Sequence, residues 1–126
     1  MYRVLRGVLV ALVWSSAMFK LSGGHDAVYW LSPTFYYAAA VLEVVLGFLL
    51  LTKWTTWASL VCSVFFACGA VLGLFIKGPC GCHGALESLI SPRAHVFVAG
   101  ILGIVASAVF FLSLRGSVRT GDALAT

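Results

Sequence analysis

The sequence predicts an all-α fold: a single domain built as a bundle of four transmembrane helices. Of its 126 residues, 62% are hydrophobic and only 10% are charged, whereas a soluble domain carries about a quarter charged residues. Four long apolar runs follow one another along the chain, and about 20 apolar residues suffice to cross a hydrocarbon core. Only helices satisfy the backbone of such short, separate spans in lipid.

The first apolar run, Gly7 to Phe19, follows Arg3 and Arg6 and predicts the first helix. A basic segment before an apolar run is also typical of a signal peptide. Lys20 comes directly after the run, with no clear small-x-small cleavage site beyond it, which favours an uncleaved helix. We expect the four helices at about residues 4–22, 34–52, 56–76 and 92–114, followed by a polar C-terminal tail at 115–126.

The second and fourth helices share a start signal. Ser32-Pro33 precedes one and Ser91-Pro92 the other. Serine is a good N-cap, and proline suits the first helical position because its missing N–H has no partner there. The third helix should end before Pro79, since proline disfavours helical geometry at the residue before it.

Small residues predict how the third and fourth helices pack. Gly69 and Gly73 form a G-x-x-x-G motif, and Ala99, Gly103 and Ser107 form a small-residue stripe on the fourth helix. Such stripes let helices approach closely in lipid. We expect the two faces to pack on each other within one chain; an intermolecular dimer face is the alternative.

Glu43 lies near the middle of the second helix. A bare carboxylate in a bilayer costs a few kcal/mol or more, so this side chain should be protonated or paired. Lys20, at the end of the first helix, is the best candidate partner, and Ser15 or Ser16 could hydrogen-bond the acid instead. Two roles stay open: a structural ion pair that fixes the first helix to the second, or a proton carrier coupled to redox chemistry.

The distribution of Lys and Arg predicts the orientation in the membrane. Five basic residues fall on the side of both termini and three on the other side, so both termini should be cytoplasmic in a bacterial inner membrane. The five are Arg3, Arg6, Lys53, Arg115 and Arg119; the three are Lys20, Lys77 and Arg93. The basic residues form no cluster, and no nucleic-acid-binding pattern is present. The loop after the third helix then faces the extracytoplasmic side, where disulfides form.

That loop contains Cys80-Gly81-Cys82-His83. Two cysteines one residue apart can bond only if the chain bends between them, and Gly81 permits such a bend. A strained disulfide is easily reduced, so the pair is better suited to thiol–disulfide exchange than to stabilising the fold. His83 and Lys77 would stabilise a neighbouring thiolate. We therefore expect Cys80, Cys82 and His83 to form a redox-active site.

Metal binding is the alternative reading of the same residues. Cys80, Cys82 and His83 could supply three ligands, and His25 or His95 could supply a fourth. Thiolates and imidazoles suit zinc or copper. Zinc sites more often use C-x2-C spacing. A turn whose thiols have no chemical role is the third reading.

The segment Pro79 to Gly84, P-C-G-C-H-G, resembles the P-C-G-C-F-G signature of the MauE branch of the DoxX-like membrane proteins. The first helix, ending in Lys20-Leu21, resembles that family's opening helix. The second helix resembles its Glu-x-x-x-Gly helix, here Glu43 and Gly47. A histidine stands where the family has an aromatic residue.

The resemblance covers residues 1 to about 114 and implies a DoxX-like bundle with a redox-associated role. MauE proteins are linked to methylamine utilisation and to maturation of the disulfide-rich small subunit of methylamine dehydrogenase, alongside a thioredoxin-like partner. DoxX relatives are linked to quinone-coupled sulfur oxidation, so a quinone is a candidate cofactor. We expect a thiol–disulfide oxidoreductase, or an accessory to one, that acts on a thioredoxin-like or disulfide-rich extracytoplasmic protein. A zinc- or copper-binding membrane module and a non-catalytic subunit of a membrane complex are the alternatives.

Overall fold

The computed structural model describes residues 1–25, 29, 31–75 and 92–123. These residues form four α-helices and contain no strand. The helices are α1 (Tyr2–Gly23), α2 (Pro33–Leu51), α3 (Thr55–Phe75) and α4 (Pro92–Ala123). Each contains an apolar stretch long enough to cross a membrane. The prediction of an all-α bundle of four membrane-spanning helices is therefore confirmed.

The outward faces of the helices are apolar. On α4, Phe97, Ile104 and Phe111 are 72%, 71% and 62% exposed, and Phe35 and Phe48 of α2 are 70% and 58% exposed. Soluble monomers rarely show apolar surface of this extent. Because lipid tails are its natural solvent, the chain is an integral membrane protein in contact with the bilayer.

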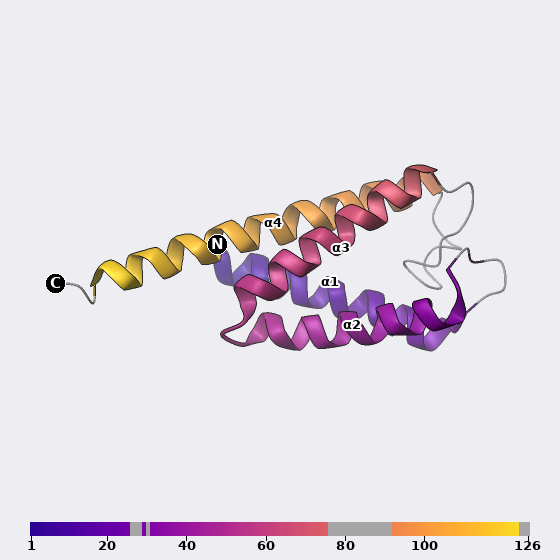
Figure 1. Ribbon diagram of the computed structural model, residues 1–126, viewed down its shortest axis with the longest axis horizontal. Helices are drawn as coiled ribbons and strands as arrows, with labels where there is room; N and C mark the ends of the chain where they lie inside the picture. The colour runs from indigo at the N-terminus through magenta and orange to yellow at the C-terminus, as the bar shows by residue number, and fades with distance from the viewer. Residues whose placement is uncertain (26–28, 30, 76–91, 124–126) are drawn as a thin grey trace.

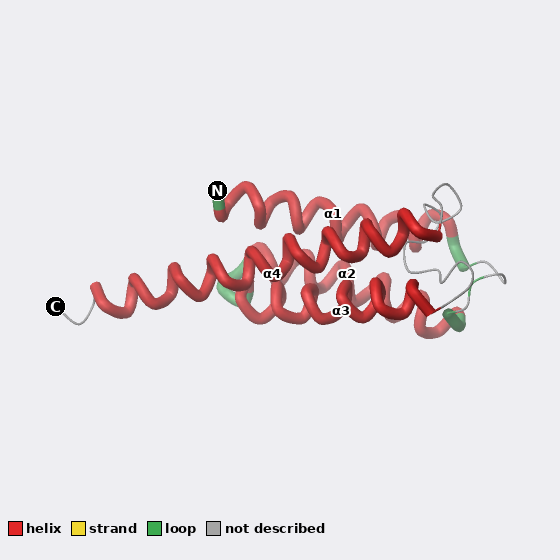
Figure 2. The backbone as a smooth tube through the Cα atoms, turned by 90° about the horizontal axis from the view of Figure 1, so that it is seen from above, coloured by secondary structure: helices red, strands yellow, loops and turns green. Residues whose placement is uncertain are grey.

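The helices form two antiparallel hairpins, α1–α2 and α3–α4 (Figure 1). Each helix packs on two neighbours, so that α1 and α4 also touch, as do α2 and α3. Seen from above, α4 runs beside α1 and continues past the other helices toward the C-terminus (Figure 2). We call the end where α1 begins the N-terminal end. The loop end is the opposite one, where α1 and α3 finish and α2 and α4 begin.

Every helix contributes at least one fully buried side chain to the core. Leu9 and Val13 of α1, Leu50 of α2, Cys62 of α3 and Val109 of α4 are all 0% exposed. They belong to one contiguous cluster. In Figure 1 the two hairpins separate toward the loop end, so they meet most closely over this cluster.

Local signals explain most helix boundaries. Ser32 is the N-cap of α2 and Pro33 its first residue, as predicted, although the serine hydroxyl makes no capping bond to the described residues. Pro92 opens α4. At the tight α2–α3 turn, the Thr52 hydroxyl donates to the Leu49 carbonyl (2.8 Å) and the Thr55 hydroxyl to the Leu50 carbonyl (2.9 Å).

The helix α4 is longer than predicted. It continues through Ala123, whereas the sequence suggested a polar tail from residue 115. Its apolar span covers Val96–Gly116, and the extension projects beyond the bundle (Figures 1 and 2). Helical hydrogen bonds are local, so a helix can leave the apolar layer without losing them.

Candidate functional site

An ion pair joins α1 to α2 inside the bundle. The Lys20 Nζ lies 2.5 Å from the Glu43 Oε1, and the two side chains are 0% and 1% exposed. This is the contact expected from the sequence. An acid and a base in a low-dielectric interior attract each other strongly, and each would be costly to bury alone.

A serine completes this polar cluster, which we define as Ser16, Lys20 and Glu43. The Ser16 hydroxyl donates to the Glu43 Oε1 (3.2 Å), and the Lys20 Nζ lies 3.5 Å from the same hydroxyl. Ser16 and Lys20 share a face because they are four residues apart on one helix. Ser15, the other serine considered, bonds the Ala11 carbonyl instead (2.7 Å). The second oxygen of Glu43 is buried and has no hydrogen-bond partner among the described residues.

The backbone of Lys20 is also tied to α2. The hydroxyl of the fully buried Tyr36 donates to the carbonyls of Lys20 (3.1 Å) and Gly24 (2.9 Å). Gly24 caps α1 with φ of 68° and donates its N–H to the Lys20 carbonyl (3.2 Å). A positive φ favours glycine. The last turn of α1 is therefore bound to α2 through both a side chain and the main chain.

One turn from Glu43, the indole of Trp14 packs directly on Gly47. A Cβ built on Gly47 would overlap the indole ring. The indole N–H donates to the Val44 carbonyl (3.3 Å), and the ring meets Phe48 edge-on at 5.0 Å between centroids. Gly47 was singled out through the resemblance to a Glu-x-x-x-Gly helix, whereas Trp14 was not predicted. No sequence signal identifies it, because the α1 residue that faces Gly47 depends on the rotation of α1 against α2.

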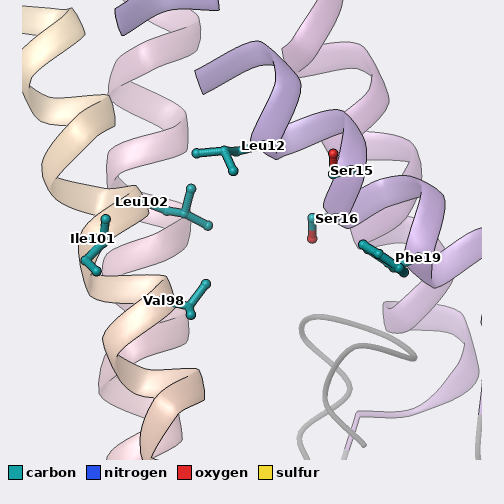
Figure 3. A pocket seen from close by; sticks show the side chains of 7 residues that line it. All are labelled: Leu12, Ser15, Ser16, Phe19, Val98, Ile101 and Leu102. Atoms are coloured by element: carbon teal, nitrogen blue, oxygen red, sulfur yellow. The ribbon is translucent and has the colours of Figure 1, made fainter. Parts of the chain in front are cut away.

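An apolar cavity of about 290 Å³ lies between α1 and α4. Figure 3 shows Leu12 and Phe19 on one side of it and Val98, Ile101 and Leu102 on the other. Ser16 lies on its wall. The polar cluster therefore reaches the edge of this cavity through one hydroxyl group.

A second apolar cavity, of about 200 Å³, is lined by Lys20 of the polar cluster. Phe35 of α2 and Phe65 of α3 form part of its wall, and Cys68 also lines it. The Lys20 Nζ is 6.0 Å from the centroid of the Phe65 ring, at the limit of a cation–π contact. If a quinone is the cofactor, Lys20, Phe35 and Phe65 are described residues that could line its site, and it would supply two-electron redox chemistry there.

The predicted redox site lies outside the described residues. Cys80, Cys82 and His83 all fall in the segment 76–91, and of His95 only the helical backbone is described. Their roles stay predictions. The structure does show that the chain leaves α3 at Phe75 and re-enters α4 at the same end of the bundle (Figure 1).

Within the described part of the chain, no three His, Cys, Asp or Glu residues group as a metal site. His25, a candidate fourth ligand, has its Nε2 2.7 Å from the Leu31 carbonyl oxygen. Its ring lies edge-on to Tyr29 and Tyr36. Cys62 is buried in the core, and Cys68 is an exposed free thiol.

The α3–α4 contact uses only part of the predicted small-residue faces. A Cβ on Gly103 would lie 3.7 Å from the Ala67 nitrogen, and the Ser63 and Ser107 hydroxyls are 3.1 Å apart. A Cβ on Gly69 would meet nothing within 4 Å, because Gly69 lines the second cavity. The described close approach therefore lies at Gly103 and Ser107 of α4, against Ser63 and Ala67 of α3, and does not include Gly69.

Comparisons with protein-family models, curated proteins and solved structures give no match for this chain. The resemblance to the MauE branch of the DoxX-like proteins stays a prediction from the sequence.

Proposed function

We propose that this protein is a membrane thiol–disulfide exchange factor of MauE/DoxX type. Cys80 and Cys82 alternate between dithiol and disulfide at the extracytoplasmic surface. Their partner is a thioredoxin-like or disulfide-rich protein on that side. The protein acts as an oxidoreductase or as an accessory to one, and the four-helix bundle fixes the cysteine pair at the membrane surface.

The exchange reaction needs no reactant other than the two loop thiols and the partner's disulfide. One loop thiolate attacks a sulfur of the partner's disulfide and displaces the other sulfur as a thiolate. The second loop thiolate then attacks the mixed disulfide. The partner leaves as a dithiol, having gained two electrons, and Cys80 and Cys82 remain bonded to each other. The protons released from the loop thiols are available to the partner's thiolates, and the reverse sequence delivers a disulfide.

The observation that carries the proposal is the position of the C-G-C pair in the chain. Cys80 and Cys82 follow shortly after Phe75, the last residue of α3. The other two cysteines have different surroundings: Cys62 is buried in the core, and Cys68 lies on α3 beside the second cavity. Of the four cysteines in the sequence, Cys80 and Cys82 are the two separated by a single residue.

The burial of Lys20 supports an extracytoplasmic loop end. Because this side chain is 0% exposed and bound to Glu43, it is not a surface charge and should not be counted among the orienting residues. The loop end then keeps only Lys77 and Arg93, which strengthens the positive-inside bias toward cytoplasmic termini.

In this proposal the polar cluster has a structural role: it holds the end of α1 against α2. Lys20 is held by Glu43 through its side chain and by Tyr36 through its carbonyl. Both partners belong to α2, so the end of α1 is fixed at the loop end. A proton-carrying role predicts a different outcome in the experiment below.

The test uses the purified full chain in detergent, equilibrated in glutathione buffers of graded potential. Free thiols are then counted with a mass-tagged maleimide, and the unpaired Cys62 and Cys68 serve as internal references. We expect the two loop thiols to disappear together on oxidation. We also expect Cys80→Ser to leave a single glutathione adduct on Cys82. Loop thiols that react independently at every potential would refute the proposal.

The rate of exchange with oxidised glutathione, followed by the same thiol count at a series of pH values, separates the two roles of the pair in a Lys20→Met/Glu43→Met variant. A structural role predicts an unchanged pH profile of this rate. A changed profile would assign the pair to proton transfer instead.

A further inference from the structure

A hollow of about 430 Å³, most of whose lining residues are polar, lies at the N-terminal end of the bundle. The start of α1, the α2–α3 turn and α4 meet around it. Its size falls in the range of small-ligand sites. It is separate from the polar cluster of Ser16, Lys20 and Glu43, because none of those three residues lines it.

The hollow is positively charged. Arg6 of α1 and Lys53 of the α2–α3 turn both line it, and its described lining includes no acidic residue. The Thr56 and Ser113 hydroxyls, 2.9 Å apart, lie on its wall and can donate to or accept from a ligand. A guanidinium group binds phosphate oxygens in pairs, and an ammonium group adds a point charge. These groups together suit a phosphate group.

The position of the hollow indicates a lipid. Trp54 and Trp57, beside it on the turn and the start of α3, are 53% and 64% exposed. Exposed tryptophans favour the level of the lipid headgroups. Leu112 and Tyr2 line the hollow and so provide apolar surface next to the charges. Basic pockets between membrane helices are known to bind anionic headgroups.

We propose that this hollow binds the headgroup phosphate of an anionic phospholipid. Arg6 contacts the phosphate oxygens, Lys53 neutralises the remaining charge, and the Thr56 hydroxyl donates a hydrogen bond. The acyl chains lie along the apolar outer surface of the bundle. A bound lipid would join α1, the α2–α3 turn and α4 at the end of the bundle opposite to the cysteine loop.

The test is native mass spectrometry of the full chain in neutral detergent, titrated with phosphatidylglycerol or with phosphatidylcholine. We expect one phosphatidylglycerol per chain and weaker binding of phosphatidylcholine. Arg6→Gln/Lys53→Gln should weaken phosphatidylglycerol binding by about tenfold or more, because the charge-assisted bond of Arg6 alone accounts for about a factor of ten and Lys53 adds a point charge. Lys53→Gln alone changes an exposed side chain and should weaken binding several-fold even if the double variant fails to fold.

The matched control is Arg3→Gln/Arg115→Gln. It removes two charges from exposed residues near the same end that do not line the hollow. Its phosphatidylglycerol affinity should equal that of the unmodified chain. Equal weakening in the control would overturn the proposal in favour of general charge attraction. Equal binding of the two lipids would overturn it as well. Displacement of the lipid by millimolar inorganic phosphate would assign the hollow to a soluble anion instead.

Discussion

Replacing the two partners of the Lys20–Glu43 ion pair, singly and together, gives the most informative stability measurement on the bundle. Both side chains are essentially unexposed, and their charged atoms are 2.5 Å apart. With an effective dielectric constant of about 20, two charges at this separation attract by about 7 kcal/mol. Desolvation costs several kcal/mol for each ion, so the intact pair contributes little net free energy of unfolding.

The single and double variants should therefore behave differently. Lys20→Met or Glu43→Met alone leaves a buried ion without its partner, and we expect each to lower the free energy of unfolding by about 3–5 kcal/mol. The double variant removes both charges and inserts two unbranched apolar side chains. It should lie within about 2 kcal/mol of the unmodified chain. Ser16 can then bond a carbonyl of its own helix.

Unfolding in mixed micelles of increasing SDS content, followed by tryptophan fluorescence, measures these differences. Trp14 reports directly on the α1–α2 contact, because its indole N–H bonds the Val44 carbonyl of α2. The expected coupling between the two sites is at least about 3 kcal/mol. Additive losses, or single variants that cost less than about 1 kcal/mol, would show that the pair is not buried as described.

Three smaller perturbations test the surrounding packing by the same unfolding assay. Gly47→Ala must displace Trp14 and should cost about 1–3 kcal/mol; Gly100→Ala, where a Cβ meets nothing within 4 Å, is its control, and equal effects would contradict the contact. Gly103→Leu should cost a similar amount by separating α3 from α4, and an unchanged stability would contradict their close approach. Tyr36→Phe removes the hydroxyl that donates to the Lys20 and Gly24 carbonyls and should cost about 1–2 kcal/mol; no loss would mean that these bonds are not formed.

The Lys20–Glu43 contact could be predicted from the sequence for a simple physical reason. The second apolar run contains one acid, and a base directly follows the first run, on a helix joined to the second by a short connection. Each charge is costly to bury without an opposite charge beside it. The helix spans could be predicted because the length and apolarity required by a bilayer are demanding. The extension of α4 could not, since polar residues outside the membrane are compatible with both helix and coil.

The Trp14–Gly47 contact and the two cavities were beyond sequence analysis. The first depends on the rotation of α1 against α2 about their long axes, and several rotations would bury comparable apolar surface. The cavities depend on the separation of the two hairpins toward the loop end (Figure 1), which no residue pattern encodes. The open surroundings of Gly69 follow from the same separation, because Gly69 lines the second of these cavities together with Lys20 of α1 and Phe35 of α2.

The redox state and sidedness of Cys80 and Cys82 in intact cells give the most direct test of the proposed thiol–disulfide exchange. Cells are treated with a membrane-impermeant maleimide before and after mild reduction, and the protein is then denatured and tagged by mass. We expect both loop cysteines to be protected before reduction and labelled from outside after it, with Cys62 unlabelled in both states. Loop cysteines that react only after the membrane is opened, or that are free thiols under all growth conditions, would contradict it.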